Sequence, residues 1–288
     1  MEQKKKFEKI KTALNAILDF LVPPNITCIY CGREIGAPNK FNACDECLQN
    51  LPFNNQKICR LCGAKIVDEA EICLSCFYSP PPFSVARAPF LYDFPISGLV
   101  SNLKFENAKF TAAPLAQFMI ETYRKHNFDA EVVIPVPLTP KRQKERKYNQ
   151  AELLAQEIAK EFDLELLTNV AARSKHTAPQ ARLNWRARQE NMRGAFTLLD
   201  KSKIMGKKIL VVDDVFTTGA TIKSFCRELQ KAKPKNICVL TLAHTYIDRV
   251  KLKNMALSMK IKYKIKMHFR KKLALRQKQK LDKKENNI

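Results

Sequence analysis

At 288 residues the chain has room for one or two domains and a substantial hydrophobic core. Only 7 glycines and 15 prolines exclude a low-complexity protein, and no apolar run reaches the roughly 18 residues that cross a bilayer. The formal charge of +23 predicts an acidic partner, either nucleic acid or an anionic lipid surface, and composition does not choose between them.

Residues 1–27 are predicted to form a short amphipathic helix. Ile10, Leu14, Ile17, Leu18 and Leu21 follow helical spacing. Asp19 interrupts the apolar run and no small-residue cleavage site follows, which argues against a signal peptide. We expect a docking helix that packs on the protein rather than a membrane anchor.

Residues 28–79 form a cysteine module with an internal repeat. The segment Cys28-Ile29-Tyr30-Cys31-Gly32 returns as Cys59-Arg60-Leu61-Cys62-Gly63, and a second C-x-x-C pair follows each copy. Two such turns complete a closed tetrahedral Cys₄ site, so we predict two structural Zn²⁺ ions rather than a catalytic metal. The predicted ligands are Cys28, Cys31, Cys44, Cys47, Cys59, Cys62, Cys73 and Cys76.

The default pairing joins neighbouring pairs, 28/31 with 44/47 and 59/62 with 73/76, and a cross-braced pairing stays open. A disulfide framework would need an oxidising compartment, and a thioredoxin-like redox site would need one pair inside a βαβ unit. Cys226 and Cys238 lie in apolar patterns and are predicted to be small buried residues.

After Pro80-Pro81-Pro82, residues 83–246 alternate between strand and helix patterns. Strands are expected at 86–92, 132–136, 165–171, 196–199, 208–212 and 237–243, and helices at 96–104, 114–125, 150–162 and 222–230. This alternation predicts an α/β domain with a largely parallel sheet covered by helices on both faces. Ligands of such sheets bind at the carboxyl ends of the strands.

Two basic segments are candidates for binding a diphosphate. Lys141, Arg142 and Arg146 follow the strand that ends near Val136, although a solvated basic loop is the alternative. Arg182 and Arg188 belong to the long polar segment 173–194, which we expect to close as a cationic flap. The alternative for that segment is a nucleic-acid-binding loop in which Trp185 stacks on bases.

The most informative motif is D-D-x-x-T-T-G-x-T between the predicted strand 208–212 and the helix that follows it. Its turn directs backbone N–H groups and threonine hydroxyls into one small space at a helix start, which suits a phosphate. The adjacent carboxylates suit a polyol or a metal, so the motif predicts a sugar phosphate. The expected ligands are Asp213, Asp214, Thr217, Thr218, Gly219, Ala220 and Thr221.

Residues 247–288 form a basic tail with fifteen Lys/Arg against three Asp/Glu. Apolar residues from Met259 to Phe269 alternate with cations, so a strand here would place its charges on one face. We expect this segment to order against DNA or an anionic surface; a disordered tail that binds nothing specific is the alternative.

The motif at Asp213–Thr221 resembles the phosphoribosyl pyrophosphate (PRPP) motif of type I phosphoribosyltransferases. Together with the cysteine module and several further segments, it makes residues 18–246 resemble the ComF family of competence-associated proteins. The other matching segments are Pro135-Val136-Pro137, Tyr148-Asn149-Gln150-Ala151-Glu152, Thr177-Ala178-Pro179-Gln180 and Asn191-Met192-Arg193-Gly194-Ala195-Phe196. Lys147 departs from the family pattern, in which glycine is usual.

The resemblance implies a type I phosphoribosyltransferase fold, PRPP as ligand with Mg²⁺, zinc in the cysteine module, and a role in DNA uptake during natural transformation. Asp213 and Asp214 would then be the catalytic residues of a transferase with an unknown acceptor. A non-catalytic PRPP sensor or an adaptor for single-stranded DNA is the alternative. The implied partners are single-stranded DNA and a competence helicase, in the cytoplasm or at the inner face of the membrane.

Overall fold

The computed structural model describes residues 27–37, 39–66, 69–105, 108–173 and 194–245. Three sequence predictions lie outside these residues: the helix within 1–27, most of the segment 173–194 with Arg182 and Arg188, and the tail 247–288. Within the described residues, no helix is long and apolar enough to cross a membrane.

The centre of the protein is a parallel sheet in the order β1-β8-β7-β3-β4, with β2 also paired to β8. The strands are β1 (Val85–Arg87), β2 (Phe90–Leu91), β3 (Val132–Pro135), β4 (Glu165–Leu166), β7 (Lys208–Phe216) and β8 (Asn236–His244). The longest pairing joins β7 to β8 in register from Lys208↔Asn236 to Phe216↔His244. The predicted α/β class with a mostly parallel sheet is therefore confirmed.

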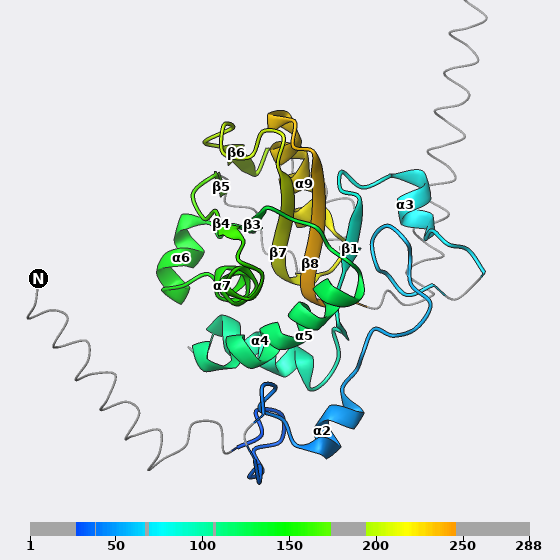
Figure 1. Cartoon of the computed structure of the whole chain (residues 1–288), viewed down its shortest axis with the longest axis vertical. Coiled ribbons are helices and arrows are strands. Elements are labelled where there is room, and N and C mark those ends of the chain that lie inside the picture. The colour runs from blue at the N-terminus through cyan, green and yellow to red at the C-terminus, as the bar shows by residue number, and fades with distance from the viewer. Residues whose placement is uncertain (1–26, 38, 67–68, 106–107, 174–193, 246–288) are drawn as a thin grey trace, which may run out of the picture.

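Helices cover both faces of this sheet (Figure 1). They are α4 (Ile96–Phe105), α5 (Ala112–Lys125), α6 (Pro140–Arg146), α7 (Gln150–Phe162) and α9 (Ala220–Leu229), with the 3₁₀ turns η1 (Lys109–Thr111) and η3 (Gln230–Ala232). Buried side chains of β7 alternate between the two faces: Leu210 and Val212 pack with α5 and α7, whereas Ile209 and Val211 pack with α9. Burial on both sides explains why the strand is continuously apolar.

Several boundaries differ from the prediction: the expected strand 86–92 is two short strands, β1 and β2, and helix α5 starts at Ala112 rather than at 114. Strand β7 continues through both aspartates to Phe216, where the sequence predicted its end at Val212, because backbone pairing with β8 extends it beyond the apolar residues. The predicted strand 165–171 is instead two short strands in different sheets. β4 pairs with β3, while β5 (Ala171–Arg173) forms an antiparallel ribbon with β6 (Phe196–Leu198).

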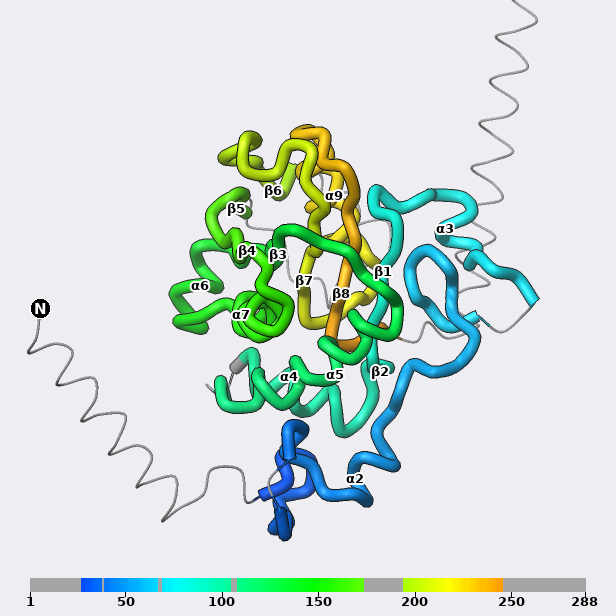
Figure 2. The backbone as a smooth tube through the Cα atoms, viewed as in Figure 1, coloured from blue at the N-terminus to red at the C-terminus, as the bar shows by residue number. Residues whose placement is uncertain are grey.

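The cysteine module lies along the outside of the sheet domain as two separate units (Figure 2). The first unit contains α2 (Asp45–Asn50) and packs below α5, where the rings of Phe41 and Phe118 stack with centroids 4.3 Å apart. The second unit contains α3 (Leu74–Tyr78) and lies beside β1, to which Leu61 is joined by a 2.7 Å hydrogen bond from the Ala86 N–H. Cys226 and Cys238 are buried, as predicted.

Candidate ligand site and metal centres

The two carboxylates of the D-D motif lie in the last part of β7 and have different surroundings. Successive side chains of a strand leave on opposite faces. Asp214 meets the α4 and α7 side, where its Oδ2 accepts hydrogen bonds from Lys104 Nζ at 2.7 Å and from Gln150 Nε2 at 3.1 Å. Its side chain is only 8% exposed, so this is a largely desolvated ion pair.

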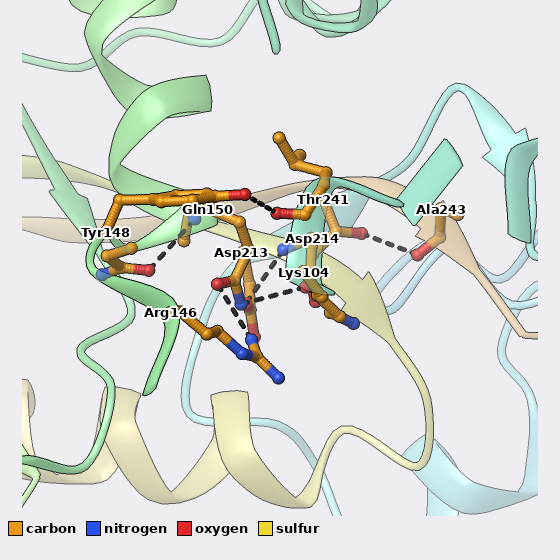
Figure 3. A network of polar contacts seen from close by, with 11 residues as sticks. Lys104, Arg146, Tyr148, Gln150, Asp213, Asp214, Thr241 and Ala243 are labelled. Carbon is orange, nitrogen blue, oxygen red and sulfur yellow. Dashed lines mark hydrogen bonds and ion pairs between the residues drawn. The ribbon is translucent and has the colours of Figure 1, made fainter. Parts of the chain in front are cut away.

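The contacts of Asp214 continue into a chain of polar groups that includes the end of α6 (Figure 3). Gln150 Oε1 accepts a 3.0 Å hydrogen bond from the guanidinium of Arg146. Arg146 is half-buried, and burial lowers its pKa, with the charge of Arg142 as the next cause. Arg146 is thus the one diphosphate candidate in the first basic segment with a described contact to the polar network around Asp214.

Asp213 is set apart by its protonation. The pKa of its carboxyl is raised to about 7, first by burial and then by the neighbouring charge of Asp214, although the Asp214 backbone N–H, Lys104 and Arg173 act in the opposite direction. Its Oδ1 accepts the Asp214 backbone N–H at 2.9 Å. A carboxyl with such a pKa exchanges its proton near neutral pH.

The turn after β7 is built around Gly219. Its φ of +71° lies in the left-handed region, and a Cβ there would come within 2.6 Å of the Phe216 ring. Glycine is therefore required both by conformation and by space. Thr217 and Thr218 are half-buried in the bend, and α9 begins directly after it at Ala220.

This arrangement places the predicted phosphate residues Thr217–Thr221 at the amino end of a ten-residue helix. Gly219 is its N-cap residue and supplies no side-chain cap; the Thr218 hydroxyl accepts from the Ala220 N–H at 3.4 Å. Free N–H groups at a helix start favour an anion.

Sequence analysis expected no helix over the first basic segment, and the structure shows the short helix α6 there. Pro140 occupies the first turn of α6, and Thr139 caps it by accepting from the Arg142 N–H at 3.4 Å. Lys141 is exposed and Arg142 half-buried on this helix. Lys147, the departure from the family pattern, ends the helix with φ +62°, so the tight turn forms although the residue is not glycine.

The cysteines gather into two groups, and each group follows the local pairing. Cys28, Cys31, Cys44 and Cys47 form one set, and Cys59, Cys62, Cys73 and Cys76 form the other, with the sulfurs of each set within 4.8 Å of one another. A tetrahedron with Zn–S bonds of about 2.3 Å has edges of about 3.8 Å. The measured Sγ–Sγ distances of 3.8 Å for Cys31–Cys44 and 3.6 Å for Cys62–Cys73 match it.

All-sulfur ligand sets with these distances fit Zn²⁺, and four cysteine ligands leave no open position for a substrate. In the second set, hydrogen bonds from Cys62 and then from Cys73 and Cys76 lower the pKa of Cys59.

Two further side chains belong to the site. Lys104 reaches Asp214 from α4, and Arg173, at the end of β5, is buried with its guanidinium 5.4 Å from the Phe196 ring. Sequence analysis gave no role to Arg173, the first residue of segment 173–194, and did not single out Lys104. The sequence alone does not distinguish a helical lysine that pairs with a buried carboxylate from a helical lysine that faces solvent.

Comparison with known proteins defines the class of this chain. Residues 149–269 match a family model described as a phosphoribosyl transferase domain, and residues 17–77 match one described as a double zinc ribbon domain. The fold is therefore that of a type I phosphoribosyltransferase, preceded by two zinc ribbons.

Full-length relatives identify the family. Competence protein F of Haemophilus influenzae is 31% identical over 227 residues, which cover 76% of this chain and 97% of that protein. DNA utilization protein YhgH of Salmonella typhimurium is 29% identical over 76% of this chain and 96% of its own length. Competence protein ComFC of Streptococcus pneumoniae is 31% identical over 54% of this chain and 66% of its own. The chain belongs to the ComF family, as the resemblance of its motifs indicated.

Proposed function

We propose that this protein binds PRPP with Mg²⁺ at the carboxyl edge of its sheet and transfers the phosphoribosyl group during the handling of incoming DNA in natural transformation. The main support is the juxtaposition of a buried, cation-paired carboxylate at Asp214 with a glycine-containing turn at the start of α9. The names of its relatives, competence protein F and DNA utilization protein YhgH, support the biological setting.

In this proposal each group has a defined task. The turn Thr217–Thr221 holds the 5′-phosphate through backbone N–H groups and hydroxyls. Asp213 and Asp214 accept hydrogen bonds from the ribose hydroxyls, and the cations of α6 with Arg182 and Arg188 neutralise the departing pyrophosphate. Carboxylate oxygens are suitable Mg²⁺ ligands, and a bound Mg²⁺ would neutralise charge on the diphosphate.

Calorimetry with PRPP and Mg²⁺ tests the binding step. Wild type should bind, and Asp213→Asn and Asp214→Asn should each bind at least about tenfold more weakly, since each loses a charged hydrogen-bond acceptor. Asp129→Asn is the matched control, because this exposed aspartate pairs with Lys208 at the opposite end of β7. No binding by wild type would contradict the proposal.

The pH dependence should follow Asp213. The deprotonated carboxyl accepts hydrogen bonds from sugar hydroxyls on both oxygens and more strongly than the protonated form does, and the pKa of Asp213 is about 7. PRPP affinity should therefore rise between pH 6 and 8, and Asp213→Asn should flatten that rise.

Transfer and sensing are separated by pyrophosphate release. A transferase releases pyrophosphate when the correct acceptor is added, so a screen of candidate acceptors with PRPP and Mg²⁺ is the decisive assay. Binding without release across such a screen favours the non-catalytic PRPP sensor.

Single-stranded DNA is the second ligand we propose, supported by the charge of +23 and the fifteen cations of the tail. Deleting residues 247–288 should flatten the salt dependence of DNA binding. An unchanged slope of affinity against salt concentration would mean that other residues bind the DNA.

We also propose a competence helicase as a partner and a cytoplasmic location that includes the inner face of the membrane. Pull-down with the helicase and flotation with anionic vesicles test these two points.

A further inference from the structure

The candidate phosphate turn packs on two buried side chains, Phe216 and Lys223. A Cβ on Gly219 would come within 2.6 Å of the Phe216 ring and 3.6 Å of Lys223 Cε, so both side chains lie against this glycine. Phe216 ends β7, and Lys223 lies in the first turn of α9, where its backbone N–H donates to the Gly219 carbonyl at 2.7 Å. The position of the turn therefore depends on what holds these two side chains.

The Phe216 ring connects the turn to the second zinc ribbon. It packs edge-on against Phe83, which follows the ribbon in the chain, with ring centroids 6.2 Å apart and planes at 90°. It also belongs to the same buried cluster as three cysteines of the second set, Cys59, Cys62 and Cys76. Because protein interiors are close-packed, a rearrangement of the ribbon in this cluster is transmitted to the ring.

Lys223 makes a second connection, to helix α3 of the same ribbon. The residue is only 3% exposed, and its ammonium donates a long hydrogen bond of 3.5 Å to the carbonyl of Ser79, the C-cap residue of α3. A buried ammonium is costly unless oxygen atoms accept its hydrogen bonds. The observed position of Lys223 therefore requires α3 to be in place.

Helix α3 in turn depends on the zinc site. It has five residues, its N-cap residue is Cys73, and it contains Cys76, so two of the predicted zinc ligands lie at its start and within it. A helix of this length is unstable by itself in water, and the ligand sulfurs are what fixes it. The first ribbon packs in a different buried cluster, on the α5 side of the sheet.

We propose that zinc in the second ribbon and the ligand at the turn Thr217–Thr221 strengthen each other's binding, with Phe216 and Lys223 as the positioning residues that connect the two sites. The inference rests on the proposed function and deepens it, because loss of this zinc then lowers the affinity of the ligand site. By thermodynamic linkage, bound ligand raises the zinc affinity of the second site by the same factor. The first zinc site lies outside the connection and serves as an internal control.

Zinc competition on the full wild-type chain tests this linkage. A chromogenic chelator that prefers Zn²⁺ to Mg²⁺ is titrated into the protein in Mg²⁺ buffer, with and without saturating PRPP. PRPP should raise the zinc affinity of the second site at least about fivefold and leave that of the first site within about twofold. Cys31→Ser, which keeps the second set of ligands intact, identifies the signal of the second site.

Calorimetry with PRPP and Mg²⁺ measures the reverse direction. Cys31→Ser should bind PRPP within about twofold of wild type, whereas Cys62→Ser should bind at least about fivefold more weakly. If Cys62→Ser does not fold, the zinc competition on wild type decides the question.

Lys223→Met tests the connecting residue and keeps all eight cysteines. The rise in second-site zinc affinity caused by PRPP should fall to about half or less, since the contact with Ser79 is lost. A loss of phosphate affinity that is the same with and without zinc leaves this rise unchanged, so the readout is specific for the connection. Lys231→Met is the matched control, because this exposed lysine lies just after α9 and pairs with Glu228; it should keep the full rise.

The possible outcomes separate this inference from the proposed function. Wild type that binds PRPP but has the same second-site zinc affinity with and without it refutes the inference alone, as does an equal rise at both zinc sites. A full rise in Lys223→Met would remove Lys223 from the connection. Wild type that does not bind PRPP refutes the proposed function, and the inference with it.

Discussion

The two zinc ribbons have the same local fold and different surroundings. In each, the first cysteine donates its N–H across the turn, from Cys28 to Arg33 and from Cys59 to Ala64, and an isolated antiparallel bridge closes the knuckle. Gly32 and Gly63 both have φ above +70° and donate to the carbonyl of the first cysteine. The backbone of the knuckle is therefore set by its own sequence.

The first ribbon packs on the α5 side of the sheet domain mainly through partly buried side chains, among them Ile29, Tyr30 and Leu48. Phe41 stacks on Phe118 of α5, and Lys40 pairs with Glu121 at 2.7 Å. Cys31 is exposed, and its Sγ accepts a hydrogen bond from Arg33, itself an exposed residue. Part of this unit is thus exposed, in contrast to the second ribbon.

The second ribbon shares the core of the sheet domain. Cys59, Cys62 and Cys76 are 0%, 4% and 2% exposed and belong to the same buried cluster as Val211 and Phe216 of β7. Because Phe216 lies under Gly219, this cluster extends from the second zinc site to the candidate phosphate turn. The first copy of the repeated motif thus packs on the core mainly through partly buried side chains, whereas the second copy contributes its cysteines to the core.

Loss of a ligand in the second ribbon should have the largest effect. Cys62→Ser should lower the free energy of unfolding by about 3 kcal/mol or more, because it forfeits part of the about 10–16 kcal/mol with which structural zinc binds. Chemical denaturation of the full chain measures it. A loss no larger than that of Cys31→Ser would remove the distinction between the ribbons.

The two glycines provide a matched pair. A Cβ at Gly63 would lie 2.7 Å from the Ala86 carbonyl oxygen, whereas a Cβ at Gly32 would have nothing within 4 Å. Both alanine variants should lose about 1–2 kcal/mol from the left-handed backbone. Gly63→Ala should lose about 1–3 kcal/mol more, since the backbone of β1 must shift. Equal losses in the two variants, measured by denaturation, would contradict the close docking of the second ribbon.

Zinc release should distinguish the ribbons as well. A chelator should remove zinc in two phases from wild type, and Cys31→Ser should lack the faster phase and hold one zinc fewer. The main melting transition of Cys31→Ser should stay closer to that of wild type than that of Cys62→Ser, because the first ribbon packs on the core mainly through partly buried side chains. Calorimetry together with zinc analysis checks both, and a single phase in wild type would argue against the comparison.

A smaller contrast is expected between two arginines. Arg87 donates to the carbonyls of Ala86 and Arg60 at 2.8 and 3.1 Å, and burial lowers its pKa. Arg87→Ala should lower the free energy of unfolding by about 1–3 kcal/mol, because the carbonyls of Ala86 and Arg60 lose a charged donor. Arg33→Ala should leave the melting temperature unchanged within error, because exposed pairs contribute little. Similar shifts of the melting temperature in both variants would contradict the expected effect of burial.

Several features followed directly from the order of residues. The C-x-x-C spacing predicted two groups of four cysteines, since four sulfurs this close in sequence meet without help from distant segments. Helix α7 was predicted at its observed bounds, 150–162, because its apolar period and its Asn149 cap are local. The continuous apolar run of β7 likewise predicted a buried parallel strand.

Other features arose only in the folded chain. β7 extends through Asp213 and Asp214 because β8 pairs with it, and Asp214 acquires two side-chain donors because Lys104 and Gln150 arrive from 110 and 64 residues away. The burial of the second ribbon depends on β1 and the sheet beside it. Local patterns determine turns, periods and ligand spacing, whereas burial, pKa and ion pairing depend on which distant segments pack together.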